Sequence, residues 1–194
     1  PNVYASVVGQ DKVYMKAIFQ EKGLPMAKGT WFYDADFKKN ENDVIKEIEK
    51  LGYPVIVKPA TTGSSVGISI ASNKKELVES ITEAMEYDSK LLVEEVIPNL
   101  RECNISVFGN YENQKTSEIE EVTSKNKFLS YQDKYIGDGT ISHAAKKTGV
   151  KAGLKESSKG SKNSASSRIP AKISAKEKKA IEDVAVQAYK ALGS

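Results

Sequence analysis

Apolar residues recur at helical spacing in four stretches of the chain. The predicted helices cover residues 11–21, 42–51, 74–87 and 174–192. Two of these stretches begin with a capping pattern, because Asn73 and Ser174 are each followed three residues later by a glutamate. Three end at a glycine, the residue that most often follows a helix.

Shorter stretches between these helices are rich in β-branched residues or alternate in polarity, which is typical of strands. The predicted strands cover residues 27–33, 54–59, 67–71, 90–97, 102–109 and 115–122. Alternation places Ile56 and Lys58 on one face of their strand and Val55 and Val57 on the other. The order of helices and strands indicates an α/β (α+β) chain with partly antiparallel sheets rather than a plain doubly wound fold.

Regular periodicity disappears between Thr123 and Ala171. Within this stretch, residues 155–167 (KESSKGSKNSASS) include six Ser and three Lys and almost nothing apolar. Because burial cannot offset the entropy of ordering such a segment, we expect it to be mobile, either as a functional lid or as a disordered insertion.

The amino-acid composition excludes several kinds of site and partner. The 194 residues suit one domain, or two small lobes that share a cleft. A single cysteine, Cys103, excludes an internal disulfide and a CxxC zinc site, and a single histidine, His143, excludes a clustered imidazole metal site. His143 lies in a polar stretch without periodicity and is expected on an exposed loop. The formal net charge of +3 comes from mixed signs, so it does not argue for a nucleic-acid partner. No apolar run approaches a membrane span, so we expect a cytoplasmic protein without a membrane partner.

The stretch GYPVIVKPATTGSSVGIS, residues 52–69, carries candidate chemistry. A strand ends in Lys58-Pro59, and a Gly- and Ser-rich loop over residues 61–67 follows. Bare backbone N–H groups, the hydroxyls of Ser64 and Ser65 and a lysine charge are what phosphate oxygens require. The loop is not a Walker A motif, because no helix-opening Gly-Lys-Ser/Thr follows. On spacing alone, a hairpin with an incidental lysine explains the pattern equally well.

A second candidate site lies in LLVEEVIPNLRECNISV, residues 91–107. An apolar strand ends in Glu94 and Glu95, a short linker follows, and the next strand opens with Glu102. Acids around a linker between two lobes could accept hydrogen bonds from an adenine amino group and ribose hydroxyls. Solvated charges at strand ends are the alternative explanation.

Several motifs in a fixed order make the pattern more specific. They are VVGQDKVYMK, LGYPVIVKPATTGSSVG, LLVEEVI followed by RECNISVFGN, FLSYQDKY, RIPA and YKALGS. Through them the chain resembles the D-alanine–D-alanine ligase family of ATP-grasp enzymes over nearly its whole length. The resemblance implies an incomplete ATP-grasp fold, with two lobes of mixed or antiparallel sheet and flanking helices. It divides the chain into a lead-in helix region (1–23), a central lobe (24–97) and the first part of a C-terminal lobe (98–194) with a lid at 123–171.

The resemblance also implies roles for single residues. Two lysines are expected to bind ATP phosphates, Lys12 and Lys58. Of the paired serines, Ser64 is expected to help organise the active site and Ser65 to lie at the phosphates. The expected base and ribose contacts are Glu94 for adenine, Glu95 and the hinge residues Val96 and Ile97 beside the base, and Glu102 for the ribose. In FLSYQDKY, Lys134 and Tyr135 match the lid residues that reach the γ-phosphate and the first of the paired serines.

In this family, ATP phosphorylates the carboxylate of one D-alanine, and the amine of a second D-alanine attacks the acyl phosphate, which supplies a peptidoglycan precursor. ATP, D-alanine and Mg²⁺ are therefore the expected ligands, and homodimerisation stays open for the full-length protein. The family's first-substrate domain is missing, and its magnesium ligands would follow residue 193. We therefore expect a fragment that is inactive alone.

Other functions stay open at this point. A D-alanine–D-serine ligase, or another ATP-grasp enzyme that joins a carboxylate to an amine, would share most of these motifs. A nucleotide-binding module without catalysis is the alternative from another class. A basic nucleic-acid module is disfavoured, because no aromatic residues interleave with the lysines at 155–162.

Overall fold

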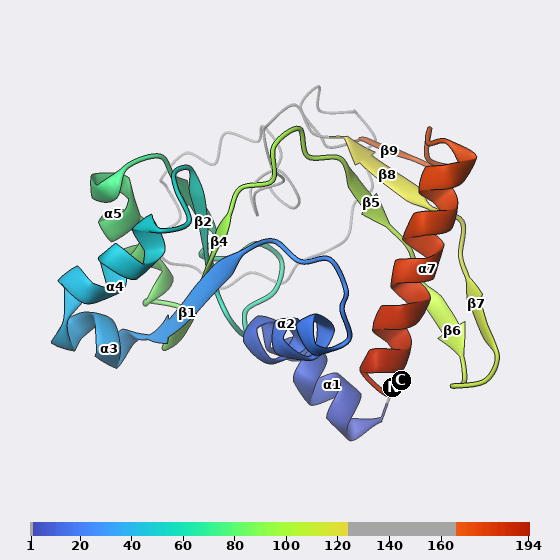
Figure 1. Ribbon diagram of the computed structural model, residues 1–194, viewed down its shortest axis with the longest axis horizontal. Coiled ribbons are helices and arrows are strands. Elements are labelled where there is room, and N and C mark those ends of the chain that lie inside the picture. The colour runs from blue at the N-terminus through green and yellow to red at the C-terminus, as the bar shows by residue number, and fades with distance from the viewer. Residues whose placement is uncertain (1, 124–165) are drawn as a thin grey trace, which may run out of the picture.

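Two groups of strands lie at opposite ends of the molecule, with α1 and α2 between them (Figure 1). The computed structural model describes residues 2–123 and 166–194. Within these residues the helices are α1 (Val3–Gln10), α2 (Lys12–Glu21), α3 (Asp34–Lys39), α4 (Glu41–Glu49), α5 (Lys74–Ala84) and α7 (Ala175–Ala191). The strands are β1 (Gly29–Tyr33), β2 (Val55–Pro59), β3 (Ser69–Ala71), β4 (Lys90–Glu95), β5 (Glu102–Asn104), β6 (Val107–Gly109), β7 (Gln114–Thr116), β8 (Glu120–Thr123) and β9 (Ser166–Arg168). The predicted boundaries between lead-in region, central lobe and C-terminal lobe stay a prediction.

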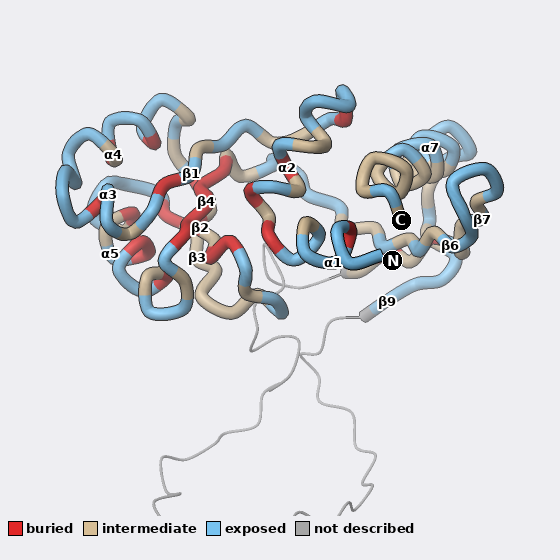
Figure 2. The backbone as a smooth tube through the Cα atoms, turned by 90° about the horizontal axis from the view of Figure 1, so that it is seen from below, coloured by how far each residue is buried: buried red, intermediate tan, exposed pale blue. Residues whose placement is uncertain are grey.

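One face of the first sheet forms the main core of the described protein. Its strands run antiparallel in the order β1-β4-β2-β3. Val55, Val57, Leu91 and Val93 are almost completely buried on this face, under α3, α4 and α5. Figure 2 shows how strongly burial concentrates in these strands. Each such side chain contributes roughly 1.5–3 kcal/mol by leaving water, so this packing fixes the sheet on which the other face is built.

The opposite face of the same sheet is more open. Ile56 and Lys58 of β2 lie on this face, half-buried, as the alternation of the sequence predicts. Helix α2 covers part of the face, because its Val13 packs with Leu92 of β4 and with Ala60. The rest of the face is left for the candidate site.

The second group of strands is thinner and less buried. It consists of a sheet in the order β5-β8-β9 and a ribbon of β6 and β7, with α7 alongside. No residue of α7 is fully buried, although Tyr189 donates its hydroxyl to the carbonyl of Gly109 at 2.8 Å. The ends of the chain meet here, since the Asn2 amide donates to the Gly193 carbonyl at 2.8 Å. No helix among the described residues is both long and apolar enough to cross a membrane.

The four predicted helices and the predicted strands 27–33, 54–59, 67–71 and 90–97 are confirmed, with ends that differ by a few residues in several of them. The capping patterns are present, since Asn73 accepts a hydrogen bond from the Glu76 amide and Ser174 forms a capping box with Glu177. Two helices were not predicted. Helix α1 is apolar on most sides and shows no helical stripe, and α3 is only six residues long, too short for a period to be recognised.

Two predicted strands, 102–109 and 115–122, are each wrong as continuous strands. Both are interrupted at the same level, so the pairing of β5 with β8 is separated from that of β6 with β7. At the interruption, the amide of Ser106 donates to the hydroxyl of Ser117, and the Ser117 amide donates to the Ser106 carbonyl. A serine side chain that competes for backbone hydrogen bonds explains the break.

The sequence predicts an irregular stretch from Thr123 to Ala171, and this prediction is wrong for a part of it. Residues 166–168 form β9, which pairs antiparallel with β8. Strand β8 supplies hydrogen bonds that the local sequence does not signal, because Ser-rich segments lack the apolar alternation by which a strand is recognised. Residues 124–165 lie outside the described part. The expectation that residues 155–167 are mobile therefore stays a prediction for 155–165, whereas 166 and 167 belong to β9.

The return of the loop after β2 depends on Gly67. Its φ is +67°, and a Cβ there would lie 2.6 Å from the Tyr87 ring and 2.8 Å from Pro59. We expect Gly67→Ala to lower the free energy of unfolding by about 2 kcal/mol or more, from the left-handed backbone together with overpacking. Urea unfolding followed by circular dichroism measures this.

Gly63, in the same loop, is the matched control. A Cβ there would meet nothing within 4 Å. Gly63→Ala should therefore stay within about 0.5 kcal/mol of the parent. Equal losses for the two variants would contradict the close approach at Gly67.

Candidate functional site

A cavity of about 320 Å³ opens on the less buried face of the first sheet. Its walls are largely apolar, with Met26, Ile56 and Ile70 among them. The polar groups converge from two neighbouring strands, Lys58 from β2 and Glu94 from β4. An apolar cavity with few convergent polar groups is the usual form of a small-molecule site. Of the predicted site residues, five line it, namely Lys58, Glu94, Glu95, Val96 and Ile97.

Glu94 is a buried carboxylate held between two ammonium groups. Its Oε1 lies 2.6 Å from Lys16 Nζ and its Oε2 lies 2.6 Å from Lys58 Nζ. Burial alone would raise the pKa of Glu94, but Lys58 and Lys16 outweigh it and hold this pKa below its ordinary value. Glu94 is therefore charged at neutral pH and serves as an acceptor.

The sheet register explains why Lys58 meets Glu94. Ile56 pairs directly with Glu94, and Lys58 pairs with Leu92. Side chains two residues apart on a strand share a face, so Lys58 and Glu94 are diagonal neighbours on the cavity side. The pairing of β2 and β4 thus places both charges in the site.

Lys12, at the first turn of α2, holds the beginning of the predicted phosphate loop. Its Nζ donates to the carbonyl oxygens of Pro59 at 3.0 Å and Ala60 at 3.3 Å, and also to that of Thr62. Burial and the nearby charge of Lys58 lower the pKa of Lys12. Two cations that repel each other beside a backbone loop make an environment that favours an anion.

The loop is also anchored from outside by Asp88. Its Oδ2 accepts hydrogen bonds from the Thr61 amide at 2.7 Å and from the Thr61 hydroxyl at 2.8 Å. Gln10 donates to the Thr61 carbonyl at 2.6 Å. Burial alone would raise the pKa of Asp88, but the hydrogen bonds from the Lys90 amide and from Thr61 outweigh it and lower this pKa. Thr61 is therefore fixed from two sides.

The paired serines adopt an uncommon backbone conformation. Ser64 has a φ of +54° and Ser65 a φ of +62°, both in the left-handed region. Such conformations are rare for residues other than glycine, and they cluster at ligand sites because surrounding structure must maintain them. This geometry supports a role for the loop in binding.

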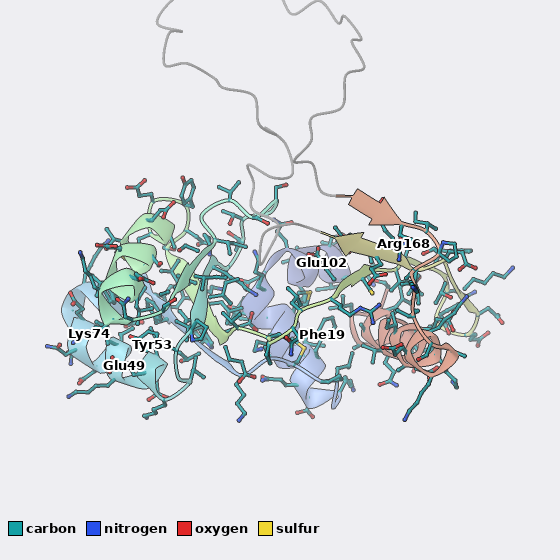
Figure 3. All side chains as sticks on the ribbon, turned by 90° about the horizontal axis from the view of Figure 1, so that it is seen from above. Phe19, Glu49, Tyr53, Lys74, Glu102 and Arg168 are labelled. Carbon is teal, nitrogen blue, oxygen red and sulfur yellow. The ribbon has the colours of Figure 1, made fainter. Side chains whose placement is uncertain are left out.

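The hinge side of the cavity is built by backbone contacts. Glu95 accepts a hydrogen bond from the Lys28 amide at 2.8 Å, and the Val96 amide donates to the Pro54 carbonyl at 3.3 Å. The predicted ribose residue Glu102 is not brought to the cavity. It opens β5 in the second group of strands, apart from β2 and β4 (Figure 3).

Some predicted residues lie outside the described part of the chain, namely Lys134, Tyr135 and His143. The apolar residues of the cavity wall, such as Met26 and Ile70, were not predicted, and neither were two charged residues that support the site, Lys16 and Asp88. Lys16 follows Lys12 by four positions, so both fall on one face of α2, and this spacing was an available signal. Asp88 gave no such signal. Among residues 2–123 and 166–194, no group of three or more His, Cys, Asp or Glu side chains could hold a metal ion.

A second buried ion pair fixes α2 against the sheet. Asp11 caps α2 by accepting hydrogen bonds from the amides of Val13 and Tyr14, and it also binds the ammonium of Lys90 on β4. The same ammonium lies 4.0 Å from the centre of the Tyr14 ring. Burial opposes the charge on Asp11, but Lys90 and the two amides outweigh it and lower its pKa. Because Lys12 and Lys16 lie on α2, this pair sets their distance from the cavity.

Comparison with known proteins gives a consistent result. A family model described as the C-terminus of D-ala D-ala ligase matches residues 18–159. A D-alanine–D-alanine ligase of Bacillus velezensis is 38% identical over 192 residues, which is 98% of this chain and 46% of that protein. One of Clostridium acetobutylicum is 36% identical over 193 residues, 99% of this chain and 48% of that protein. The chain thus spans about half the length of the curated relatives it matches.

Solved structures show the same likeness. The VanG D-Ala:D-Ser ligase of Enterococcus faecalis matches with a TM-score of 0.71 and 28% identity, over 99% of this chain and 47% of that one. A D-alanine–D-alanine ligase of Bacillus anthracis matches with a TM-score of 0.68 and 23% identity, over 98% of this chain and 51% of that one. At that identity the second match shows the fold alone.

The pair of Asp11 and Lys90 yields a stability prediction. Asp11→Asn keeps a capping side chain but leaves the Lys90 charge without its partner, so it should lower the free energy of unfolding by about 3 kcal/mol at pH 7. Lys90→Met should cost a similar amount, and the double variant should lose clearly less than the sum. Urea unfolding of the four proteins gives the coupling energy, and strict additivity would contradict the pair.

The same pair predicts a pH dependence. Because the native pKa of Asp11 is lowered, its contribution is present above the unfolded pKa and is lost as pH falls through the native pKa. The stability difference between the parent and Asp11→Asn should therefore shrink as the solution is acidified below pH 4. A difference that stays constant in this range would show that Asp11 acts only as a cap.

Proposed function

Because the chain belongs to the D-alanine–D-alanine ligase family, we propose that it is the nucleotide-binding part of an ATP-grasp ligase that joins two D-alanines. The product would serve as a precursor of peptidoglycan, and the enzyme would work in the cytoplasm with Mg²⁺. The observation that carries the proposal is the cavity, where Lys58 and Glu94 converge from two strands beside a loop that Lys12 holds.

The residues present fit a nucleotide. The apolar walls suit a planar base, and backbone groups at the hinge residues Val96 and Ile97 lie where its edge could be bound. At the other side, Lys58 and Lys12 provide positive charge for phosphate oxygens, together with the backbone around Ser64 and Ser65. Glu94 is proposed as the adenine acceptor and Glu95 as a further contact beside the base.

In the ligation reaction, these residues would bind and orient rather than form bonds. Bound ATP supplies the phosphoryl group that activates the first carboxylate. The lysines would offset the negative charge of the phosphates, and such preorganised charge is usually the largest contribution to phosphoryl transfer. Glu102 is proposed as a ribose contact from the second lobe, and Lys134 and Tyr135 as groups of the lid.

Two features belong to the parent protein rather than to the described residues. Mg²⁺ is proposed as a cofactor of the full-length protein, and no group of three or more His, Cys, Asp or Glu side chains among residues 2–123 and 166–194 is assigned to it. Homodimerisation is likewise proposed only for the full-length protein. The site of the first D-alanine is likewise proposed only for the full-length protein.

A second candidate substrate has a specific observation behind it. The structural match with 28% identity is to a D-Ala:D-Ser ligase, so D-serine is proposed as an alternative second substrate. Comparing D-alanine and D-serine as nucleophiles in the parent enzyme separates the two. Product formation with D-serine at a comparable kcat/KM would favour the alternative.

The nucleotide-binding proposal predicts the effect of removing the Lys58 charge. Lys58→Met should weaken ATP binding by about tenfold or more, because a hydrogen bond to a charged group is worth roughly 1.5–3 kcal/mol. The melting temperature should change little, since Glu94 keeps Lys16 as a partner. Isothermal titration calorimetry and thermal unfolding measure the two effects.

Lys75→Met on α5 is the matched control, because its side chain is 86% exposed, does not line the cavity, and lies on a helix that packs on the opposite face of the sheet. It should leave ATP affinity unchanged. Failure of the unaltered chain to bind ATP, or equal affinity in Lys58→Met, would contradict the proposed site.

The 194-residue chain spans about half the length of the curated relatives it matches, so we expect it not to release ADP in response to D-alanine. The full-length parent should do so with Mg²⁺. A coupled assay for ADP checks both proteins side by side. D-alanine-dependent turnover by the chain alone would show that it holds the whole catalytic machinery.

A further inference from the structure

Lys16 is paired with Glu94, the carboxylate that lines the cavity. It is only 6% exposed and is not among the residues that line the cavity. Its ammonium donates to the Ala27 carbonyl and to Glu94 Oε1, the latter at 2.6 Å. A buried lysine is costly unless it is paired, so its place beside Glu94 calls for a function.

Exposure increases from Lys16 towards the cavity. The side chain of Lys16 is 7% exposed, that of Glu94 9%, and that of Lys58 24%. Lys16 also donates a hydrogen bond to the Ala27 carbonyl, before β1, whereas within residues 2–123 and 166–194 the Lys58 ammonium donates only to Glu94. Lys58 is therefore the cation with room to turn towards a ligand, and Lys16 is the one that stays.

The balance of charges gives the consequence. Glu94 carries one negative charge and has two cations, one on each oxygen. When Lys58 turns to an anion, Lys16 still neutralises Glu94. Without Lys16, the same movement would leave a buried carboxylate unpaired, which is strongly unfavourable, so Lys58 would be retained by Glu94.

We propose that Lys16 is a positioning residue that neutralises Glu94 and so releases Lys58 to bind the phosphates of the nucleotide. This inference rests on the proposed function, because it needs a nucleotide in the cavity. It assigns Lys16 no contact with the nucleotide. Its effect must therefore appear in the binding of phosphates and not in the binding of the base.

The test compares two ligands that share the base and ribose. The dissociation constants of adenosine and ATP are measured by calorimetry with the 194-residue chain. The adenosine constant divided by the ATP constant is the ratio that isolates the contribution of the phosphates. We expect Lys16→Met to lower this ratio by about tenfold, the effect of one charged hydrogen bond, with adenosine affinity changed much less. Lys16→Arg should retain most of the ratio, because the charge is kept.

Two further variants separate this role from simple support of the fold. In the double variant Lys16→Met, Glu94→Gln, no carboxylate at position 94 competes for Lys58. The ratio should therefore recover towards the value of the unaltered chain. Any effect of Glu94→Gln on the base contact cancels in the ratio. Lys22→Met, an exposed position at the end of the same helix, should leave the ratio unchanged.

Each outcome decides. A lowered ratio in Lys16→Met that recovers in the double variant supports the inference. An unchanged ratio in folded Lys16→Met overturns it and leaves the proposed function intact. If Lys16→Met does not fold, Glu94→Gln alone decides, since a higher ratio supports the inference and a lower one shows that Glu94 aligns Lys58 for the phosphates. Failure of the parent chain to bind either ligand overturns the proposed function and this inference together.

Discussion

A buried negative charge on β4 is the constraint around which the described site is organised. Burial of the charged Glu94 carboxylate is unfavourable unless cations neutralise it. The fold brings two cations to it, Lys16 from α2 and Lys58 from β2. The helix must therefore lie across the sheet at a fixed distance, and the strands must keep their register. The pair of Asp11 and Lys90 meets the first requirement, and the buried aliphatic face of the sheet meets the second.

Local patterns in the sequence were sufficient for the first sheet and for its helices α4 and α5, whereas α3 was too short to be predicted. Val55 and Val57 alternate with Ile56 and Lys58, and this alternation identifies both the core face and the cavity face. The second group of strands was less predictable. Its strands are three or four residues long and their pairing is set by partners distant in sequence, as for β9. Such segments carry too few residues for a period of two to be distinguished from chance.

The candidate site was predictable where a residue ends a strand or follows a glycine, as Lys58 and the loop with Ser64 and Ser65 do. Lys16 and Asp88 act through other residues, one on Glu94 and one on Thr61. The spacing of Lys12 and Lys16 on α2 was an available signal for Lys16, but Asp88 leaves no motif, because its partner Thr61 lies elsewhere in the chain. The resemblance to a ligase family predicts the direct contacts with a nucleotide, whereas the supporting interactions became visible only in the fold.

The anchoring of the loop after β2 has a consequence for the cost of binding. Asp88 and Gln10 fix Thr61 at one end, and at the other end Gly67 lies against Pro59 and Tyr87. Only the residues between these two points can rearrange around a ligand, and fixing a residue costs roughly 1–2 kcal/mol of backbone entropy. A loop anchored at both ends has already lost most of its freedom on folding. Most of the entropy cost of ordering this loop is therefore included in folding rather than in binding. More of the interaction energy between the loop and a bound anion would then remain as affinity.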